Sequence, residues 1–224
     1  MSKKILLTGS EGLIGKEIYK HLKKLKFKVT KIDLKLGHDL TNSNVVKKLM
    51  NENNDHSYLI NLHGLNDHIT KNRKKSNDEL DHFDKMFRAN VYSTYLTNKY
   101  FIEKSSKPKG IINFASLYAI QSPKHYIYEV PKDIFYVASK FSVIGLTKYY
   151  SSLFGKKLNI NCIVNGGIET NQPKNFKKKM RQLIPNRRMM KVEDLFGVIE
   201  LLLSDKSNYI NGSSIVIDGG YSAW

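Results

Sequence analysis

Short apolar runs, each followed by a turn and a helical pattern, recur along the whole chain of 224 residues. The runs lack the apolar–polar alternation of a half-exposed strand, which is typical of a parallel sheet covered on both faces. Expected strands lie at 4–8, 28–34, 58–64, 110–116, 158–164 and 213–219, and expected helices at about 14–24, 44–50, 81–104, 134–154 and 192–204. The sequence therefore predicts one α/β domain over 1–224, a doubly wound parallel sheet with helices on both faces.

Composition limits where such a chain can work. No apolar run approaches the roughly 20 residues that span a bilayer, so a membrane partner is not expected. The apolar run at the N-terminus is too short for a signal peptide, and the single cysteine, Cys162, excludes an internal disulfide. We expect a cytoplasmic protein.

The formal net charge of +17 brings a nucleic-acid partner into consideration. The lysines are nevertheless scattered along the chain, and the densest groups are short, at 71–75 and 177–181. A solvated basic surface is the favoured interpretation, and a field that attracts anions is the alternative. Nucleic acid is an unlikely partner on this pattern.

A glycine-rich segment, "TGSEGLIG" at 8–15, lies between the first expected strand and the first expected helix. Gly9, Gly12 and Gly15 permit a tight turn and let the backbone approach a pyrophosphate at the helix N-terminus. The segment predicts a Rossmann-like dinucleotide site. The alternative is a tight turn that needs glycine for its geometry alone.

Asp33 ends the second expected strand, 18 residues after Gly15. A carboxylate there accepts hydrogen bonds from both ribose hydroxyls of adenosine and repels a 2′-phosphate, which favours NAD over NADP. Glu11, in the glycine-rich segment, adds negative charge near Asp33. Lys31 and Lys35 add positive charge there, which would favour NADP. An ordinary exposed aspartate is the alternative.

Tyr136 and Lys140, in "FYVASK", share one helix face one turn apart. Alone, the pair is better explained as part of an amphipathic helix with an exposed lysine, because the chain is rich in lysine and tyrosine. Its context decides, because a glycine loop, an acidic strand end and a strand ending at Ser116 precede it in that order.

This order of motifs, with "NLHG" at 61–64, "NGGIET" at 165–170 and "DGG" at 218–220, resembles the short-chain dehydrogenase/reductase family over essentially the whole chain. The stretches around "FYVASK" and the closing "IVIDGGYSAW" look like members that modify surface polysaccharides and flagellin sugars.

The resemblance implies a catalytic set of Asn90, Ser116, Tyr136 and Lys140. Tyr136 would be the general acid or base at the substrate oxygen. Lys140 would favour the phenolate by its charge and hold the nicotinamide ribose. Ser116 would orient the substrate oxygen, and Asn90 would hold a water in a proton relay.

The resemblance also implies NAD as the cofactor and a set of contacts to it. A metal site is not expected. Asp39 would contact the adenine, although a turn or cap residue explains it nearly as well. Thr170 would contact the carboxamide or the pyrophosphate, and a residue with no cofactor contact is the alternative. The expected cofactor contacts are Gly9, Glu11, Gly12, Leu13, Ile14, Gly15, Asp33, Asp39, Leu40, Asn61, Gly64, Tyr136, Lys140, Ile168 and Thr170.

Two segments depart from the family and bear on the substrate. An insertion at about 118–131 is expected to lie over the site, with surface elaboration as an equal alternative. A basic loop at about 166–190 resembles the family's substrate lid. Its basic side chains would suit a phosphorylated or nucleotide-linked substrate, and equally an acidic carrier protein, although a solvated helix face explains them too. The expected substrate contacts are Ser116, Tyr126, Tyr128, Tyr136 and Gly167, with Lys124 as a further candidate.

Three functions remain. The first is an NAD-dependent oxidoreductase that acts on a hydroxyl or carbonyl of a small anionic substrate, such as a sugar phosphate or a nucleotide sugar. The second is a 3-oxoacyl-acyl-carrier-protein reductase, which Asp33 disfavours because that activity usually uses NADPH. The third is a nucleic-acid-binding protein on a dinucleotide fold. Family likeness also implies a homodimer or homotetramer.

Overall fold

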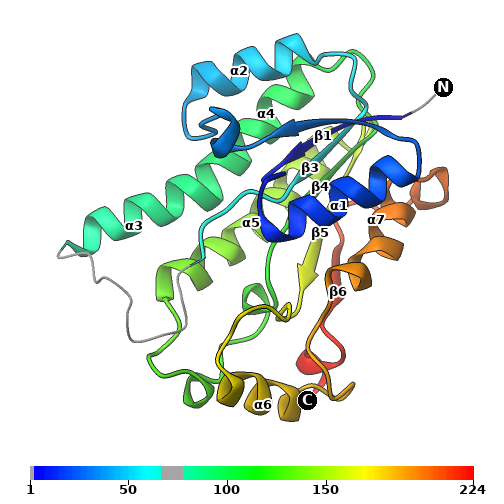
Figure 1. Cartoon of the computed structure of the whole chain (residues 1–224). Coiled ribbons are helices and arrows are strands. Elements are labelled where there is room, and N and C mark those ends of the chain that lie inside the picture. The colour runs from blue at the N-terminus through cyan, green and yellow to red at the C-terminus, as the bar shows by residue number, and fades with distance from the viewer. Residues whose placement is uncertain (1–2, 67–77) are drawn as a thin grey trace.

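The computed structural model describes residues 3–66 and 78–224 and shows one α/β domain built on a parallel sheet (Figure 1). Its strands are paired in the order β2-β1-β3-β4-β5-β6, all parallel. The strands are β1 (Lys4–Thr8), β2 (Lys28–Ile32), β3 (Tyr58–Asn61), β4 (Gly110–Phe114), β5 (Asn159–Asn165) and β6 (Ser214–Ile217).

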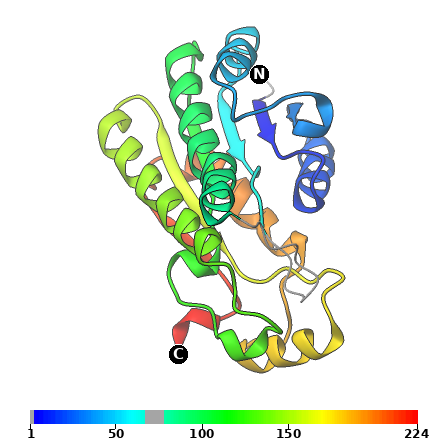
Figure 2. The ribbon, with the colours of Figure 1, turned by 90° about the vertical axis from the view of Figure 1, so that its left-hand side faces the viewer.

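Helices cover both faces of the sheet. In chain order the helices of the domain are α1 (Leu13–Lys24), α2 (Ser43–Glu52), α3 (Glu79–Phe87), α4 (Ser93–Lys104), α5 (Ile134–Phe154), α6 (Lys174–Leu183) and α7 (Phe196–Leu202). Figure 2 shows α4 and α5 on one side of the sheet and α1 on the other. The predicted doubly wound parallel fold is confirmed.

Alternate residues of each strand face opposite layers, as the pleat requires. On β1, Ile5 and Leu7 pack in the cluster that holds α1 and α7, whereas Leu6 packs in the cluster that holds α2, α4 and α5. All three are fully buried. Because both faces of the strand are covered, its sequence shows an unbroken apolar run and no alternation.

The strand order reverses at β1, which has β2 on one side and β3 on the other. The connections from β1 and β3 therefore leave the sheet in opposite directions and open a crevice at the carboxyl ends of the strands. A third buried cluster lies beyond those ends and contains Tyr118, Ile127, Tyr136, Phe176 and Met180. The fold thus places a crevice and an apolar wall at the same edge of the sheet.

Two elements differ from the sequence expectation. The helix expected at 81–104 changes at Arg88–Tyr92 into a π-helical turn, which separates α3 from α4. The segment 166–190, expected to be irregular, contains α6. This helix is rich in lysine and buries only Phe176 and Met180, so its apolar period is too sparse to stand out in the sequence.

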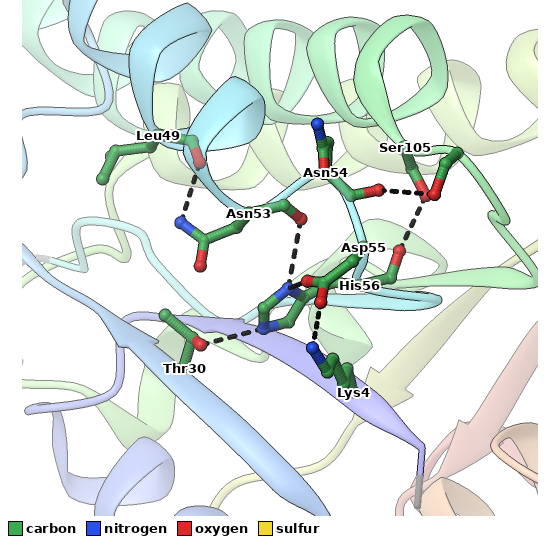
Figure 3. Close-up of polar contacts among 9 residues, drawn as sticks. Lys4, Thr30, Leu49, Asn53, Asn54, Asp55, His56 and Ser105 are labelled. Atoms are coloured by element: carbon green, nitrogen blue, oxygen red, sulfur yellow. Dashed lines mark hydrogen bonds and ion pairs between the residues drawn. The ribbon is translucent and has the colours of Figure 1, made fainter. Parts of the chain in front are cut away.

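A polar network ties the amino-terminal edge of the sheet together (Figure 3). The His56 side chain is buried, and its Nε2 lies 2.8 Å from Thr30 Oγ1 on β2. Its Nδ1 lies 3.1 Å from the carbonyl oxygen of Asn53. The Ser105 hydroxyl, at the end of α4, donates to the His56 carbonyl at 2.7 Å. Burial lowers the pKa of His56, so the ring is neutral at pH 7 and joins edge strand β2 to the loop before β3.

We expect Thr30→Val to lower the free energy of unfolding by about 1–2 kcal/mol, because it leaves a buried imidazole nitrogen without its partner. Urea unfolding at pH 7 measures this change. Ser152→Ala, which removes a hydroxyl from an exposed helix position, is the control. Equal stability of the two variants would contradict the role given to the network.

Candidate active site

Two adjoining cavities form a cleft at the carboxyl ends of the strands. Both are lined by Leu62, Gly64 and Leu65, which follow β3. The first also holds Gly9, Gly12, Asp33, Asp39, Leu40 and His63. The second, of about 350 Å³, also holds Leu13, Ile14, Ser116, Tyr136, Lys140, Gly167, Ile168 and Thr170. The cleft therefore runs from the end of β2 to α5 and joins most of the residues that the sequence singled out.

The glycine loop lets three backbone segments meet at the floor of this cleft. Gly9 has a φ of +66°, and a Cβ there would lie 2.6 Å from the backbone nitrogen of His63. A Cβ on Gly15 would lie 2.1 Å from the Gly9 carbonyl oxygen. The N-terminus of α1, which starts after Gly12, has no side-chain cap, so its first N–H groups remain available to a ligand. This cradle fits a dinucleotide pyrophosphate.

Asp33 is fixed at the rim of the first cavity by two backbone groups. Its carboxylate accepts hydrogen bonds from the backbone N–H of Glu11 and of Lys35, each at 2.9 Å. The Lys31 ammonium pairs with the Glu11 carboxylate at 2.7 Å, and this partner raises the pKa of Lys31. The positive charge of Lys31, which was expected to oppose that of Asp33, is therefore neutralised by the Glu11 carboxylate. Glu11 also holds the Asp33 carboxylate through its backbone N–H.

The other expected cofactor residues divide into two groups. Asp39 and Leu40 line the first cavity, although the Asp39 carboxylate also accepts from the backbone N–H and the hydroxyl of Thr41 and so closes a turn. Asn61 lines neither cavity. Its amide donates to Asn98 and Asn113 in the sheet interior, each at 2.9 Å. The side chain of Asn61 therefore supports β3 and β4, and its expected cofactor contact stays a prediction.

Ser116 and Tyr136 are positioned by helix caps. Ser116 follows β4 and caps a short 3-10 helix, accepting from the Tyr118 N–H at 3.3 Å. Tyr136 lies in the first turn of α5, and its N–H donates to the Asp133 carboxylate at 2.8 Å. The other Asp133 oxygen lies 2.6 Å from His82 Nε2 on α3. The start of α5 is therefore anchored from two sides, which fixes Tyr136 toward the cavity.

The ionisable groups of the pair are both buried. Burial raises the pKa of Tyr136, and a hydrogen bond with Ser116 acts in the opposite direction. Burial lowers the pKa of Lys140 to about 8. The Lys140 ammonium donates to the Phe114 carbonyl at 3.2 Å and lies 6.0 Å from the centre of the Tyr136 ring. Tyr136 is therefore a neutral phenol at pH 7, and the hydrogen bond with Ser116, rather than the charge of Lys140, is what opposes the effect of burial on its pKa.

Asn90 lies in the π-helical turn between α3 and α4. Its Oδ1 accepts from the Leu65 N–H at 2.6 Å, and its Nδ2 donates to Ser139 at 2.9 Å. A Cβ on Gly64 would lie 3.0 Å from Asn90 Oδ1 and 3.5 Å from Lys140 Nζ. Asn90 and Lys140 therefore flank Gly64, and the proton relay expected of Asn90 stays a prediction.

The substrate end of the cleft differs from the sequence expectation. Tyr128 and Gly167 line the second cavity, but Tyr126, 67% exposed, and Lys124 do not. None of the basic residues of α6 lines the cavity, and three of them have other partners: Lys177 and Arg181 pair with Glu169, and Lys179 donates to the Tyr126 carbonyl. Phe176 and Met180 are the α6 side chains at the cavity wall. The lid is therefore apolar inside and basic outside.

Sequence reasoning missed Lys132, Asn66, Tyr118 and Gln172, which all line the second cavity. Lys132 is only 8% exposed, and its ammonium lies 4.3 Å above the centre of the Tyr136 ring. The available signal was its place in "VPKD", directly before the residue that caps α5. In a chain this rich in lysine, that position alone does not stand out.

Within 3–66 and 78–224, no group of three or more His, Cys, Asp or Glu residues could hold a metal ion. In the same residues, no helix is long and apolar enough to cross a membrane. The basic group at 71–75 lies outside the described residues.

Comparison with known proteins identifies the family. A family model described as enoyl-(acyl carrier protein) reductase matches residues 5–222. The chain belongs to the short-chain dehydrogenase/reductase family. A 3-oxoacyl-acyl-carrier-protein reductase of Thermotoga maritima is 30% identical over 183 residues, which is 79% of this chain and 70% of that protein. This short-chain dehydrogenase/reductase is accordingly an NAD(P)-dependent oxidoreductase.

Two further relatives bear on the narrower likeness and on the cofactor. The post-translational flagellin modification protein A of Campylobacter coli is 30% identical over 116 residues, which is 50% of this chain and 45% of that protein. A short-chain dehydrogenase from Leptospira borgpetersenii, solved with bound NAD+, is 27% identical, with a TM-score of 0.86 over 99% of this chain and 93% of that one. The expected likeness to flagellin-modifying members of the family is thus confirmed.

The buried charge of Lys140 has a measurable cost. Its pKa is about 8 in the folded chain, against 10.5 ordinarily, so the folded state binds fewer protons than the unfolded state between these values. We expect Lys140→Met to be more stable than the wild type at pH 7, and the difference to shrink as the pH rises from 8 to 10.5. Denaturant unfolding across this range measures it. A difference independent of pH would contradict the assignment.

Proposed function

We propose that this chain is an NAD-dependent dehydrogenase or reductase of a small anionic substrate, with Tyr136 as its general acid or base. The observation that carries the proposal is the meeting of Ser116, Tyr136 and Lys140 in one cavity that adjoins the glycine-loop cradle. Binding alone needs none of these three side chains. Their convergence supports chemistry at a carbon–oxygen bond.

The residues of the second cavity divide the work. The nicotinamide, when bound, supplies or accepts the hydride. Tyr136 holds the proton that passes to or from the substrate oxygen, and Ser116 orients that oxygen by a hydrogen bond. Lys140 offers a positive charge that stabilises the phenolate form and a donor for the nicotinamide ribose. Asn90, fixed to Leu65 and beside Gly64, keeps the proton path to Lys140 open.

Three observations support NAD as the cofactor. The Asp33 carboxylate is held at the rim of the first cavity. Lys31 is paired with Glu11, and Lys35 contributes its backbone N–H to Asp33. A 2′-phosphate at this rim would meet a fixed negative charge that Lys31, held by Glu11, does not offset.

A carrier-protein reductase remains the second candidate. The Thermotoga maritima relative carries that name, and the basic outer face of α6 would suit an acidic carrier. Asp33 opposes it, because that activity usually uses NADPH. Nothing in the cleft favours the nucleic-acid alternative.

A homo-oligomer is also proposed. α4 and α5 lie side by side on one face of the molecule (Figure 2). Phe141, Tyr149 and Leu153 of α5 are 49–63% exposed, and Tyr92, just before α4, is 40% exposed. A second copy would cover these side chains. The mass in solution, measured by light scattering over a range of concentrations, tests this.

We expect Tyr136→Phe to lower kcat by at least about a hundredfold while the dissociation constant of NADH changes little, because only the proton-carrying hydroxyl is lost. Steady-state kinetics and NADH fluorescence measure the two quantities. Tyr126→Phe is the matched control, since Tyr126 lies outside the cavity wall. Full activity of Tyr136→Phe would refute the mechanism.

We expect the wild type to bind NADH more tightly than NADPH, and Asp33→Ala to lose about tenfold or more of its NADH affinity, because charge-assisted hydrogen bonds to ribose are lost. NADPH affinity should rise in the same variant. Fluorescence titration measures both, with Asp205→Ala, at the opposite edge of the sheet, as the control. Preference of the wild type for NADPH would overturn the cofactor assignment and favour the carrier-protein reductase.

A further inference from the structure

Two tyrosines, Tyr118 and Tyr128, line the second cavity beside the catalytic set. Both belong to the segment 118–131, which lies next to α6 beyond the carboxyl ends of the strands (Figures 1 and 2). Their hydroxyls are hydrogen-bonded to each other. The Tyr118 N–H also donates to Ser116 Oγ at 3.3 Å. The phenol pair is therefore tied to the residue that orients the reacting oxygen.

The proton count of this pair leaves one donor unused. Each phenol carries one proton, so two phenols joined by one hydrogen bond keep one O–H that has to find an acceptor elsewhere. The hydroxyl of Tyr221, in the same apolar cluster, is not that acceptor, because it is buried without a hydrogen-bond partner among the described residues. Burial raises the pKa of Tyr118 and of Tyr128, so both keep their protons at pH 7. Whichever tyrosine carries it, the unused O–H belongs to a residue of the cavity wall.

A hydroxyl group of a ligand matches this pair. The pair offers one O–H donor together with lone pairs on its two oxygens, and a hydroxyl both accepts and donates, whereas a carboxylate only accepts. The surface around the pair is apolar. The rings of Tyr128 and Phe176 pack with their centres 5.1 Å apart, and Met180 lines the same wall. This wall therefore accommodates a carbon skeleton that carries a hydroxyl.

We propose that Tyr118 and Tyr128 bind a second hydroxyl of the substrate, close to the carbon–oxygen bond that reacts at Tyr136. The inference rests on the proposed function, because it takes the reacting oxygen to lie at Ser116 and Tyr136. The substrate is then a hydroxyketone or a diol, which is the pattern of a sugar derivative. An analogue that lacks this hydroxyl would bury the phenol O–H without an acceptor, and a site built in this way discriminates against such an analogue.

The test compares ketones that differ in one group. NADH oxidation measures kcat/KM for two matched pairs, hydroxyacetone with 2-butanone and 4-hydroxy-2-butanone with 2-pentanone. A methyl group replaces the hydroxyl in each pair, so the shape hardly changes. The ratio of kcat/KM within a pair cancels any general loss of activity or stability in a variant. Tyr118→Phe, Tyr128→Phe and the double variant remove the hydroxyls, and Tyr126→Phe, in the same segment but outside the cavity wall, is the matched control.

We expect the wild type to favour at least one hydroxyketone over its matched ketone by about tenfold or more. Each single variant should lower that ratio by about threefold to tenfold, because the remaining phenol still offers a hydroxyl. The double variant should bring the ratio to about one. Tyr126→Phe should keep the ratio of the wild type.

The inference is overturned if the wild type shows no preference within either pair, if the double variant keeps the ratio of the wild type, or if none of these ketones is reduced. Acetoacetate and ethyl acetoacetate are further probes, whose second oxygens only accept hydrogen bonds. A larger preference for either of them that depends on Tyr128 would also overturn it.

Fluorescence titration of the wild type with NADH separates this inference from the proposed function. Normal NADH binding together with any of these outcomes removes only the role of the phenol pair. Absence of NADH binding removes the proposed function itself.

Discussion

The close approach of backbone to backbone around Gly9 determines the rest of the active site. A side chain at Gly9 would collide with the backbone after β3, and one at Gly15 would collide with Gly9 itself. Without these contacts α1 would not point its uncapped N-terminus into the crevice, and Leu62–Leu65 would not follow the crevice floor. Leu62, Gly64 and Leu65 line both cavities, so the cofactor cradle and the catalytic cavity both depend on glycine at positions 9 and 15.

The site then brings together ionisable side chains whose charged forms are disfavoured by burial. Lys140 loses part of its preference for the charged form, and Tyr136 loses part of its tendency to ionise. The imidazole of His63, in the first cavity, has its pKa lowered to about 3 by burial and by the charge of Lys140. All three shifts favour neutral side chains. A cationic nicotinamide would change that balance, so the charge state of the site depends on the bound cofactor as well as on the protein.

The parts of this picture that follow from short-range patterns could be predicted from the sequence. The parallel sheet follows from unbroken apolar strands, and the glycine cradle and Asp33 follow from their places at strand ends. Ser116, Tyr136 and Lys140 were singled out by the order of motifs along the chain and the family resemblance that it carries, and the structure brings them into one cavity. Lys132 and α6 were not recognised as parts of the cavity wall, because that role depends on the direction in which their side chains point in the folded chain. The same limit applies to Asn61, whose amide points into the sheet interior, and to the lysines of α6, which do not line the cavity.

The π-helical turn at Arg88–Tyr92 has a consequence for how the two ends of the long helical segment relate. α3 and α4 follow one another without a break, yet the extra residue in the wider turn changes the rotational phase between them. α4 can therefore keep its buried face on the sheet, while α3 turns a different face toward α5 and brings His82 to Asp133. A single-residue deletion within the turn would restore an unbroken α-helix and would rotate α3 against α5. The helical segment thus consists of two continuous parts, α3 and α4, whose buried faces point in different directions.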